Sequence, residues 1–284
     1  MKYKWWVIIV ISLTAATAFG QNFKGSLFII GGGERPLAMM QQMIASAQLQ
    51  VNDYIVVLPM SGSNADTSFF YIREDIRKAC NNAMLMFNFT KATAHYQPWL
   101  DSLQHAKLVF ITGGDQNRFM DIVLHTPIHQ AIKKAFANGA TIAGTSAGAA
   151  VMSQQMITGN ELLKDSIGSG PFTQIKYNMV EIKEGLGLVT TAIIDQHFIV
   201  RSRYNRLLSV LAANPTVQCI GIDEATAIII KGKKVTVTGE SQVIRMRLPL
   251  KKKAPAVQSD KVRLQQVQLD VLSEGDAFML NSLE

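Results

Sequence analysis

The sequence predicts an α/β protein: a mostly parallel sheet flanked by helices on both faces. Three observations support this fold class. From residue 25 onward, short β-rich runs alternate with helical patterns, which is the order of βαβ units. The apolar residues of those runs are nearly continuous, as in strands buried on both faces. The chain has 284 residues, of which 48% are hydrophobic and 17% charged, so it can bury one large core.

The first half of the chain contains most of the alternating elements. Strands are predicted over residues 25–30, 54–58, 84–88, 108–111 and 141–143. Helical spacing of apolar residues predicts helices over residues 36–49, 68–79, 117–124 and 128–138. The same order resumes with a strand over 191–194, a helix over 199–212 and a strand over 219–222.

The last portion of the domain has a different pattern. β-Branched runs over residues 226–230, 234–238 and 243–248 are separated by Gly-Lys and Gly-Glu turns. This pattern predicts a C-terminal antiparallel β extension. Residues 254–262 are polar and are expected to form a loop. We therefore expect one domain over residues 21–284, β-rich from about residue 225 onward.

The first 20 residues are typical of an export signal. Lys2 and Lys4 precede an apolar segment, and Ala18-Phe19-Gly20 resembles a cleavage site. The uncharged stretch 5–20 has 16 residues, whereas a membrane-spanning helix needs about 20. We expect cleavage near Gln21 and a periplasmic or extracellular protein that is not held in the membrane afterward.

Charge and cysteine content restrict the function further. Lys and Arg number 28 against 21 Asp and Glu, a formal charge of +7, which favours an acidic partner. No nucleic-acid-binding motif accompanies this charge, and Lys251 to Lys253 are typical of a solvated loop. Cys80 and Cys219 are the only cysteines; their spacing indicates no disulfide, so their pairing stays open. The oligomeric state, a homodimer included, stays open too.

The sharpest local signal is Gly144-Thr145-Ser146-Ala147-Gly148, a G-x-S-x-G pattern between a predicted strand and a helix. Such a turn presents the serine hydroxyl above the edge of the sheet. The alternative is a turn in which Ser146 only caps the helix. A second glycine turn begins at Gly113-Gly114 after another strand and is expected at the same edge. The N–H groups of Ala147 and Gly114 are the candidate oxyanion-hole donors.

A nucleophilic serine needs a base, and the sequence has five histidines. His125 and His129 lie in a polar helical stretch that favours the surface. His197 instead follows a buried strand, at the same sheet edge as Ser146, and is the predicted base. Arg201, Arg203 and Arg206 come next and are expected on a helix. They are either a solvated helix side or guanidinium groups that bind substrate carboxylates.

These motifs, together with Gly113-Gly114-Asp115-Gln116, Asp195-Gln196-His197-Phe198 and Gly221-Ile222-Asp223-Glu224, resemble the cyanophycinases and, more distantly, dipeptidase E, of the S51 serine peptidase family. The resemblance implies a class I glutamine-amidotransferase-like fold and an acyl-enzyme mechanism that requires no metal or cofactor. It implies that Ser146 is the nucleophile and His197 the base. The implied pocket for acidic or β-aspartyl peptides is lined by Gln116, Asp195, Gln196, Arg201, Arg203 and Arg206.

The third member of the triad is harder to locate. By the resemblance to dipeptidase E it lies shortly after the nucleophile helix, where Glu161 is the first candidate and Asp165 the second. Three alternatives to a cyanophycinase-type enzyme remain. They are a dipeptidase that trims short aspartyl peptides, a non-catalytic protein that binds an acidic ligand, and a glutamine amidotransferase. The last has cysteine, not serine, at the turn.

Overall fold

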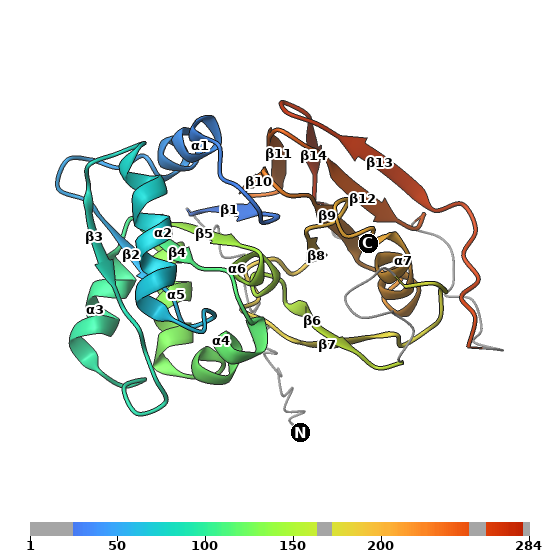
Figure 1. Ribbon diagram of the computed structural model, residues 1–284, viewed down its shortest axis with the longest axis horizontal. Coiled ribbons are helices and arrows are strands. Elements are labelled where there is room, and N and C mark those ends of the chain that lie inside the picture. The colour runs from blue at the N-terminus through green and yellow to red at the C-terminus, as the bar shows by residue number, and fades with distance from the viewer. Residues whose placement is uncertain (1–24, 164–171, 250–259, 281–284) are drawn as a thin grey trace, which may run out of the picture.

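The computed structural model describes residues 25–163, 172–249 and 260–280. The expected export signal, Asp165 and Lys251 to Lys253 lie outside these residues. The main sheet has eight strands in the order β14-β11-β10-β1-β5-β4-β2-β3 (Figure 1). Within the described ranges, no helix combines the length and the apolar character needed to cross a membrane.

The predicted parallel sheet is confirmed in the first half of the chain. Its five strands are β1 (Ser26–Ile30), β2 (Tyr54–Leu58), β3 (Ala83–Met86), β4 (Leu108–Ile111) and β5 (Thr141–Thr145). All neighbouring pairs among them are parallel. The carboxyl ends of β1, β4 and β5 therefore lie together at one edge, and the loops that follow them can meet there.

Helices cover both faces of this sheet, also as predicted. One face carries α1 (Leu37–Ala47) and α2 (Ala65–Arg77), whose buried side chains pack against alternate residues of the parallel strands. The opposite face carries α3 (Gln97–His105), α4 (Gln116–Val123) and α5 (Pro127–Ala137), which pack on the remaining residues. Continuous apolar strands are thus explained by burial on two sides.

The C-terminal strands are antiparallel, as expected, but they divide between two sheets. The strands β10 (Thr226–Lys231), β11 (Lys234–Gly239) and β14 (Ala277–Met279) extend the main sheet beyond β1. A second sheet, β13-β12-β9-β8, contains β8 (Ala192–Gln196), β9 (Gln218–Ile222), β12 (Val243–Arg247) and β13 (Gln268–Leu272). His197 therefore follows a strand of the second sheet, so the prediction that it shares one sheet edge with Ser146 is wrong.

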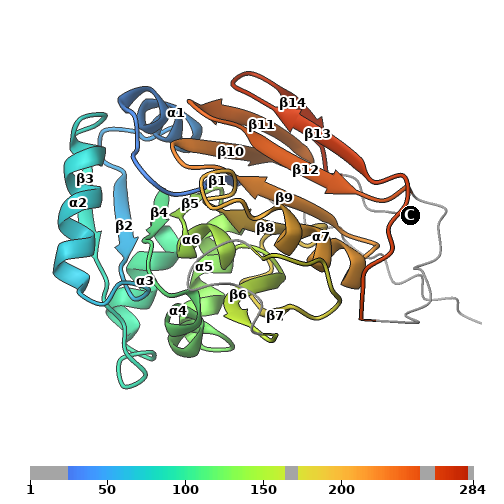
Figure 2. The ribbon, with the colours of Figure 1, turned by 45° about the vertical axis from the view of Figure 1, so that its right-hand side comes forward.

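Two smaller features complete the fold. The strands β6 (Gln155–Glu161) and β7 (Val180–Glu184) pair with each other in a separate two-stranded sheet that the sequence did not indicate. The helix α7 (Tyr204–Ala213) packs on the second sheet (Figure 2). It was expected from residue 199, but the segment before it is a turn: Ser202 has a φ of 48°, and Asp223 Oδ1 accepts the N–H groups of Ile199 and Val200 at 2.9 and 3.0 Å.

Candidate active site

Ser146 lies at the end of β5, immediately before the short helix α6 (Ala147–Ala150). Its φ of 53° and ψ of −109° are values that a non-glycine residue rarely adopts. The flanking glycines explain how the turn fits. A Cβ on Gly144 would lie 2.5 Å from the carbonyl oxygen of Gly148, and one on Gly148 would lie 2.2 Å from that of Ile111. The side chain of Ser146 makes no capping hydrogen bond to α6, which excludes the capping alternative.

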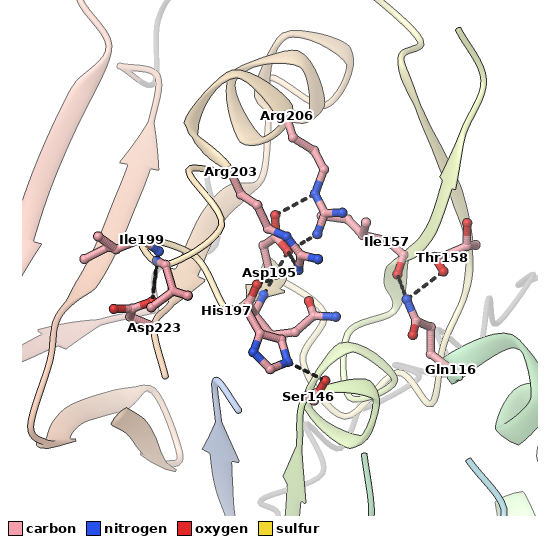
Figure 3. A network of polar contacts seen from close by, with 12 residues as sticks. Gln116, Ser146, Ile157, Thr158, Asp195, His197, Ile199, Arg203, Arg206 and Asp223 are labelled. Atoms are coloured by element: carbon pink, nitrogen blue, oxygen red, sulfur yellow. Dashed lines mark hydrogen bonds and ion pairs between the residues drawn. The ribbon is translucent and has the colours of Figure 1, made fainter. Parts of the chain in front are cut away.

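The hydroxyl of Ser146 is instead hydrogen-bonded to a histidine–glutamate pair. Ser146 Oγ lies 2.8 Å from His197 Nε2 (Figure 3), and His197 Nδ1 lies 2.6 Å from Glu224 Oε1. Because a carboxylate accepts at Nδ1, that nitrogen carries the proton and Nε2 is left to accept the serine proton. This geometry is the one in which a neutral imidazole acts as a general base.

The structure does not place Glu161 against His197. Glu161 ends β6, where it pairs with Val180 across the hairpin and is exposed. The acid that contacts the imidazole, Glu224, follows β9, and β9 pairs in parallel with β8 with Gln196 opposite Ile222. The segments after these two strands therefore emerge side by side. In the sequence, Glu224 could have been found from the run of residues 221–224, in which an acid follows a buried strand.

Three consecutive glycines after β1 support the imidazole and the carboxylate. A Cβ on Gly32 would lie 2.2 Å from His197 Cε1, and one on Gly33 would lie 2.7 Å from Glu224 Cβ. Both glycines have positive φ, 121° and 68°. The carbonyl of Gly31 accepts the backbone N–H of His197 at 2.8 Å. The loop after β1 thus fixes the base from the main sheet, a role that sequence reasoning missed.

Burial is the main influence on the protonation of His197. It lowers the pKa of the imidazole below its usual value, and the hydrogen bond that the imidazole donates to Glu224 opposes this effect. The positive charges of Arg201 and Arg203 lower the pKa further, whereas the charge of Glu224 raises it. The imidazole is therefore neutral at neutral pH, the state that a base requires.

Of the two predicted oxyanion donors, Ala147 adjoins the serine, whereas in the glycine turn it is Gly113, and not the predicted Gly114, that is shown in contact with Ser146. Ala147 is the residue directly after Ser146, and a Cβ on Gly113 would lie 3.5 Å from Ser146 Cβ, so the second glycine turn does reach the serine as expected. Gly114 has a φ of 135° and packs against the Ser61 carbonyl. However, α6 has only four residues, so its aligned peptide dipoles are few and individual N–H groups are the donors to consider.

Two of the three predicted pocket arginines, Arg203 and Arg206, bind Asp195 of the protein itself. Asp195 is fully buried. Arg206 contacts both of its carboxylate oxygens, while Arg203 Nη1 donates to Asp195 Oδ1 at 3.3 Å and to the Gln196 carbonyl at 2.6 Å. Figure 3 shows both guanidinium groups pointing toward Asp195. Burial lowers the pKa of Arg203 to about 10, so this side chain remains charged at neutral pH.

The remaining predicted site residues differ in their surroundings. Arg201 is exposed, and both Arg201 and Arg203 precede α7, so the expectation of three arginines on one helix is wrong. The backbone N–H of Arg201 donates to the His197 carbonyl at 3.1 Å. Gln116 Nε2 donates to the carbonyls of Ile157 and Thr158 at 3.1 and 2.6 Å, and so ties α4 to β6. The Gln196 side chain is buried, and its Oε1 has no hydrogen-bond partner among the described residues.

Other candidate side chains fall outside this cluster. His129 was expected at the surface but is buried, with Nε2 3.0 Å from the Leu186 carbonyl, because α5 packs that face against the sheet. His125 is exposed and pairs with Glu184 at 3.2 Å. Both cysteines are free thiols; Cys219 is buried, which raises its pKa, and Cys80 is half-buried.

Fold and geometry together define a class: an α/β protein in which a serine in a strand-to-helix turn is hydrogen-bonded to a histidine–glutamate pair. The model of peptidase family S51 matches residues 27–238. This range is most of the chain and contains all three of these residues. The chain belongs to peptidase family S51.

Individual relatives agree with this family. The chain is 36% identical to a cyanophycinase of Trichormus variabilis over 189 residues, which are 63% of this chain and 59% of that protein. It is 35% identical to a cyanophycinase of Geminocystis herdmanii over 175 residues, 60% and 61% of the two chains. It is 26% identical to a cyanophycinase of Thermosynechococcus vestitus over 269 residues, 91% and 80% of the two chains. The matched region thus spans about three fifths of the first two relatives.

Solved structures confirm the fold. A peptidase from an acI-B1 actinobacterium superposes with a TM-score of 0.64 at 18% identity, over 91% of this chain and 98% of that one. A protein described as a Peptidase E from Listeria monocytogenes superposes with a TM-score of 0.53 at 17% identity, over 76% and 99%. At these identities the likeness concerns the fold alone.

Proposed function

We propose that the protein is a serine peptidase of the cyanophycinase type that hydrolyses acidic or β-aspartyl peptides, with Ser146, His197 and Glu224 as its catalytic triad. One observation carries the proposal: the unbroken chain of hydrogen bonds from Ser146 Oγ through the imidazole to Glu224, with 2.8 and 2.6 Å between its heavy atoms. Glu224 replaces Glu161 as the third member.

The mechanism follows from the positions of the protons. His197 Nε2 takes the proton of Ser146 Oγ as that oxygen attacks the peptide carbonyl, and Glu224 stabilises the imidazolium. The imidazolium then gives this proton to the leaving amine, and water hydrolyses the acyl-enzyme with His197 again as base. The N–H of Ala147 and an N–H of the Gly113-Gly114 turn are the proposed donors to the oxyanion.

The substrate class rests on charge and on the relatives. The chain carries a formal charge of +7, and the backbone N–H of the exposed Arg201 donates to the His197 carbonyl at 3.1 Å. Three relatives in which a large part of the chain is matched are cyanophycinases. Cyanophycin is a polyaspartate backbone with arginine side chains, so β-Asp-Arg units are the expected products. Gln116, Gln196 and Arg201 are the proposed substrate contacts, whereas Arg203 and Arg206 act by holding Asp195.

Export to the periplasm or the medium is part of the proposal and rests on residues 1–20. Secretion would expose the enzyme to polymer released by other cells. Mass analysis of the protein secreted by its natural host should find an N-terminus at Gln21. A full-length cell-associated chain beginning at Met1 would contradict export without affecting the proposed chemistry.

The activity is tested by incubating the mature protein with cyanophycin, with isoaspartyl dipeptides and with short N-terminal aspartyl peptides. The products are identified by mass. Release of β-Asp-Arg units from the polymer by the native protein, but not by Ser146→Ala, is the expected result. Cleavage of dipeptides alone would identify a dipeptidase instead, and binding of the polymer without cleavage would identify a binding protein.

A further inference from the structure

A cavity of about 200 Å³ opens beside Ser146, on the side of α2. Its walls come from the loop after β1, from α2 and from the carboxyl ends of β4 and β5, and they include Arg35, Ser68, Tyr71 and Thr145. Asp195, Arg203 and Arg206, together the Asp195 cluster, lie in β8, at the N-cap of α7 and in α7. In both ribbon views α2 and α7 lie on opposite sides of α6 (Figures 1 and 2). A peptide placed across Ser146 therefore has the cavity on one side and the Asp195 cluster on the other.

The cavity contains one guanidinium group with free hydrogen-bonding capacity. Arg35 Nε donates to Asp75 Oδ2 at 2.8 Å, and Nη1 makes a long contact of 3.4 Å with the Gly33 carbonyl. Within the described residues Nη2 has no protein acceptor. The Arg35 side chain is 20% exposed, so it is held in place but remains reachable. Arg206, by contrast, directs Nε and Nη2 to one carboxylate.

The charge around Arg35 favours an anionic ligand. Asp75 also accepts from Lys78 Nζ at 3.1 Å, so two cations share a single carboxylate and a net positive charge remains. The hydroxyl oxygen of Thr145 is buried and has no hydrogen-bond partner among the described residues, which leaves a second polar group in the wall without an internal partner. A guanidinium that is oriented by one carboxylate binds a second carboxylate with charge-assisted hydrogen bonds.

The cavity is large enough for one residue of a peptide substrate. A volume of about 200 Å³ accommodates a single amino-acid side chain with its carboxylate, and Tyr71, which is 61% exposed, forms an aromatic rim at the entrance. We propose that this cavity is a substrate subsite in which Arg35 binds a carboxylate of the residue next to the scissile bond on the α2 side. The inference rests on the proposed peptidase function and adds a specificity residue to it.

The test compares substrates that differ in one charge. A short aspartyl peptide that the native enzyme cleaves is prepared with each carboxylate in turn converted to its amide. For the native enzyme, one such replacement should lower kcat/KM by about ten- to a hundredfold, as expected for hydrogen bonds to a charged group. In Arg35→Gln the acidic peptide should lose the same factor, and the corresponding amide should lose little.

Lys78→Gln is the matched control, because Lys78 binds the same Asp75 but is 62% exposed and does not line the cavity. It should lower the preference for the carboxylate far less than Arg35→Gln does, because it removes only an exposed charge outside the cavity. Arg35→Lys retains the charge and should keep part of the preference, which covers the case in which Arg35→Gln folds poorly. Equal losses of kcat/KM on the acid and amide peptides in both Arg35 variants would overturn the subsite.

Binding separates this inference from the proposed function. Calorimetric titration of Ser146→Ala with the acidic peptide and its amide needs no turnover. Weaker binding of the acidic peptide to the Ser146→Ala, Arg35→Gln double variant supports the subsite even if the native protein cleaves nothing. Unchanged binding overturns the subsite even if the native protein is an active peptidase.

Discussion

Two acids are close to His197, and their surroundings differ: Asp195 lies two residues before it in sequence, and Glu224 contacts its imidazole. Asp195 is fully buried and its two oxygens face the guanidinium groups of Arg203 and Arg206. Glu224 is 32% exposed in its side chain and contacts the imidazole. The comparison teaches that a carboxylate surrounded by fixed cations serves to hold elements together, whereas one that faces an imidazole is suited to orient that imidazole and to stabilise its protonated form.

The largest effect is expected from removing the hydroxyl that is hydrogen-bonded to His197. Ser146→Ala should lower kcat by about 10⁶-fold, because the nucleophile is lost and the remaining groups act only with it. The thermal unfolding midpoint should change little, since the turn already contains small residues. Stopped assays with cyanophycin and a circular dichroism melt measure both quantities; activity near that of the native protein would exclude Ser146 as nucleophile.

The next effect distinguishes the two glutamates considered for the triad. Glu224→Gln should lower kcat by about 10⁴-fold, because an amide no longer fixes the tautomer of His197 or stabilises the imidazolium. Glu161→Gln is the control, since Glu161 is exposed at the end of β6, and kcat should remain within about twofold of the native value. The opposite ranking of the two variants would restore Glu161 to the triad.

Asp195→Asn tests the other half of the comparison. Loss of this charge leaves two buried or half-buried guanidinium groups without their counter-charge, which should cost about 3–5 kcal/mol of unfolding free energy. Urea denaturation followed by fluorescence measures the change. Glu184→Gln, which removes an exposed pair with His125, should cost less than about 1 kcal/mol. A stable Asp195→Asn variant with altered KM alone would show that Asp195 serves the substrate and not the fold.

The smallest effect is a shift in the pH profile. Because burial keeps the pKa of His197 below 6.5, the acid limb of kcat/KM should lie below pH 6.5. Arg201→Ala removes a positive charge that lowers this pKa and should move the limb to higher pH. Because the pKa of His197 is lower in the folded protein than in the unfolded chain, the folded state is stabilised above pH 6.5. This contribution to stability is lost as the pH falls through the folded pKa. An acid limb above pH 6.5 in the native enzyme would contradict this account.

Local patterns predicted the parallel layer of the sheet and the two residues Ser146 and His197 that the structure brings into contact. The strands over 54–58 and 108–111 were predicted with their exact ends, because both are buried runs between polar or glycine-rich turns. Ser146 and His197 were placed together correctly. Glu161 was not, because which acid reaches the imidazole depends on the pairing of β8 with β9, a contact between distant segments that no local spacing encodes. The engagement of Arg206 with Asp195 is a long-range contact of the same kind.

The imidazole and the hydroxyl come from different sheets, since Ser146 follows β5 of the main sheet and His197 follows β8 of the second. The glycine loop after β1 is the piece of the main sheet that meets the imidazole. Catalytic activity therefore depends on the position of the second sheet relative to the main sheet. Mild denaturant or a cavity at their junction would be expected to abolish turnover while each sheet still retains its own hydrogen-bonded strands.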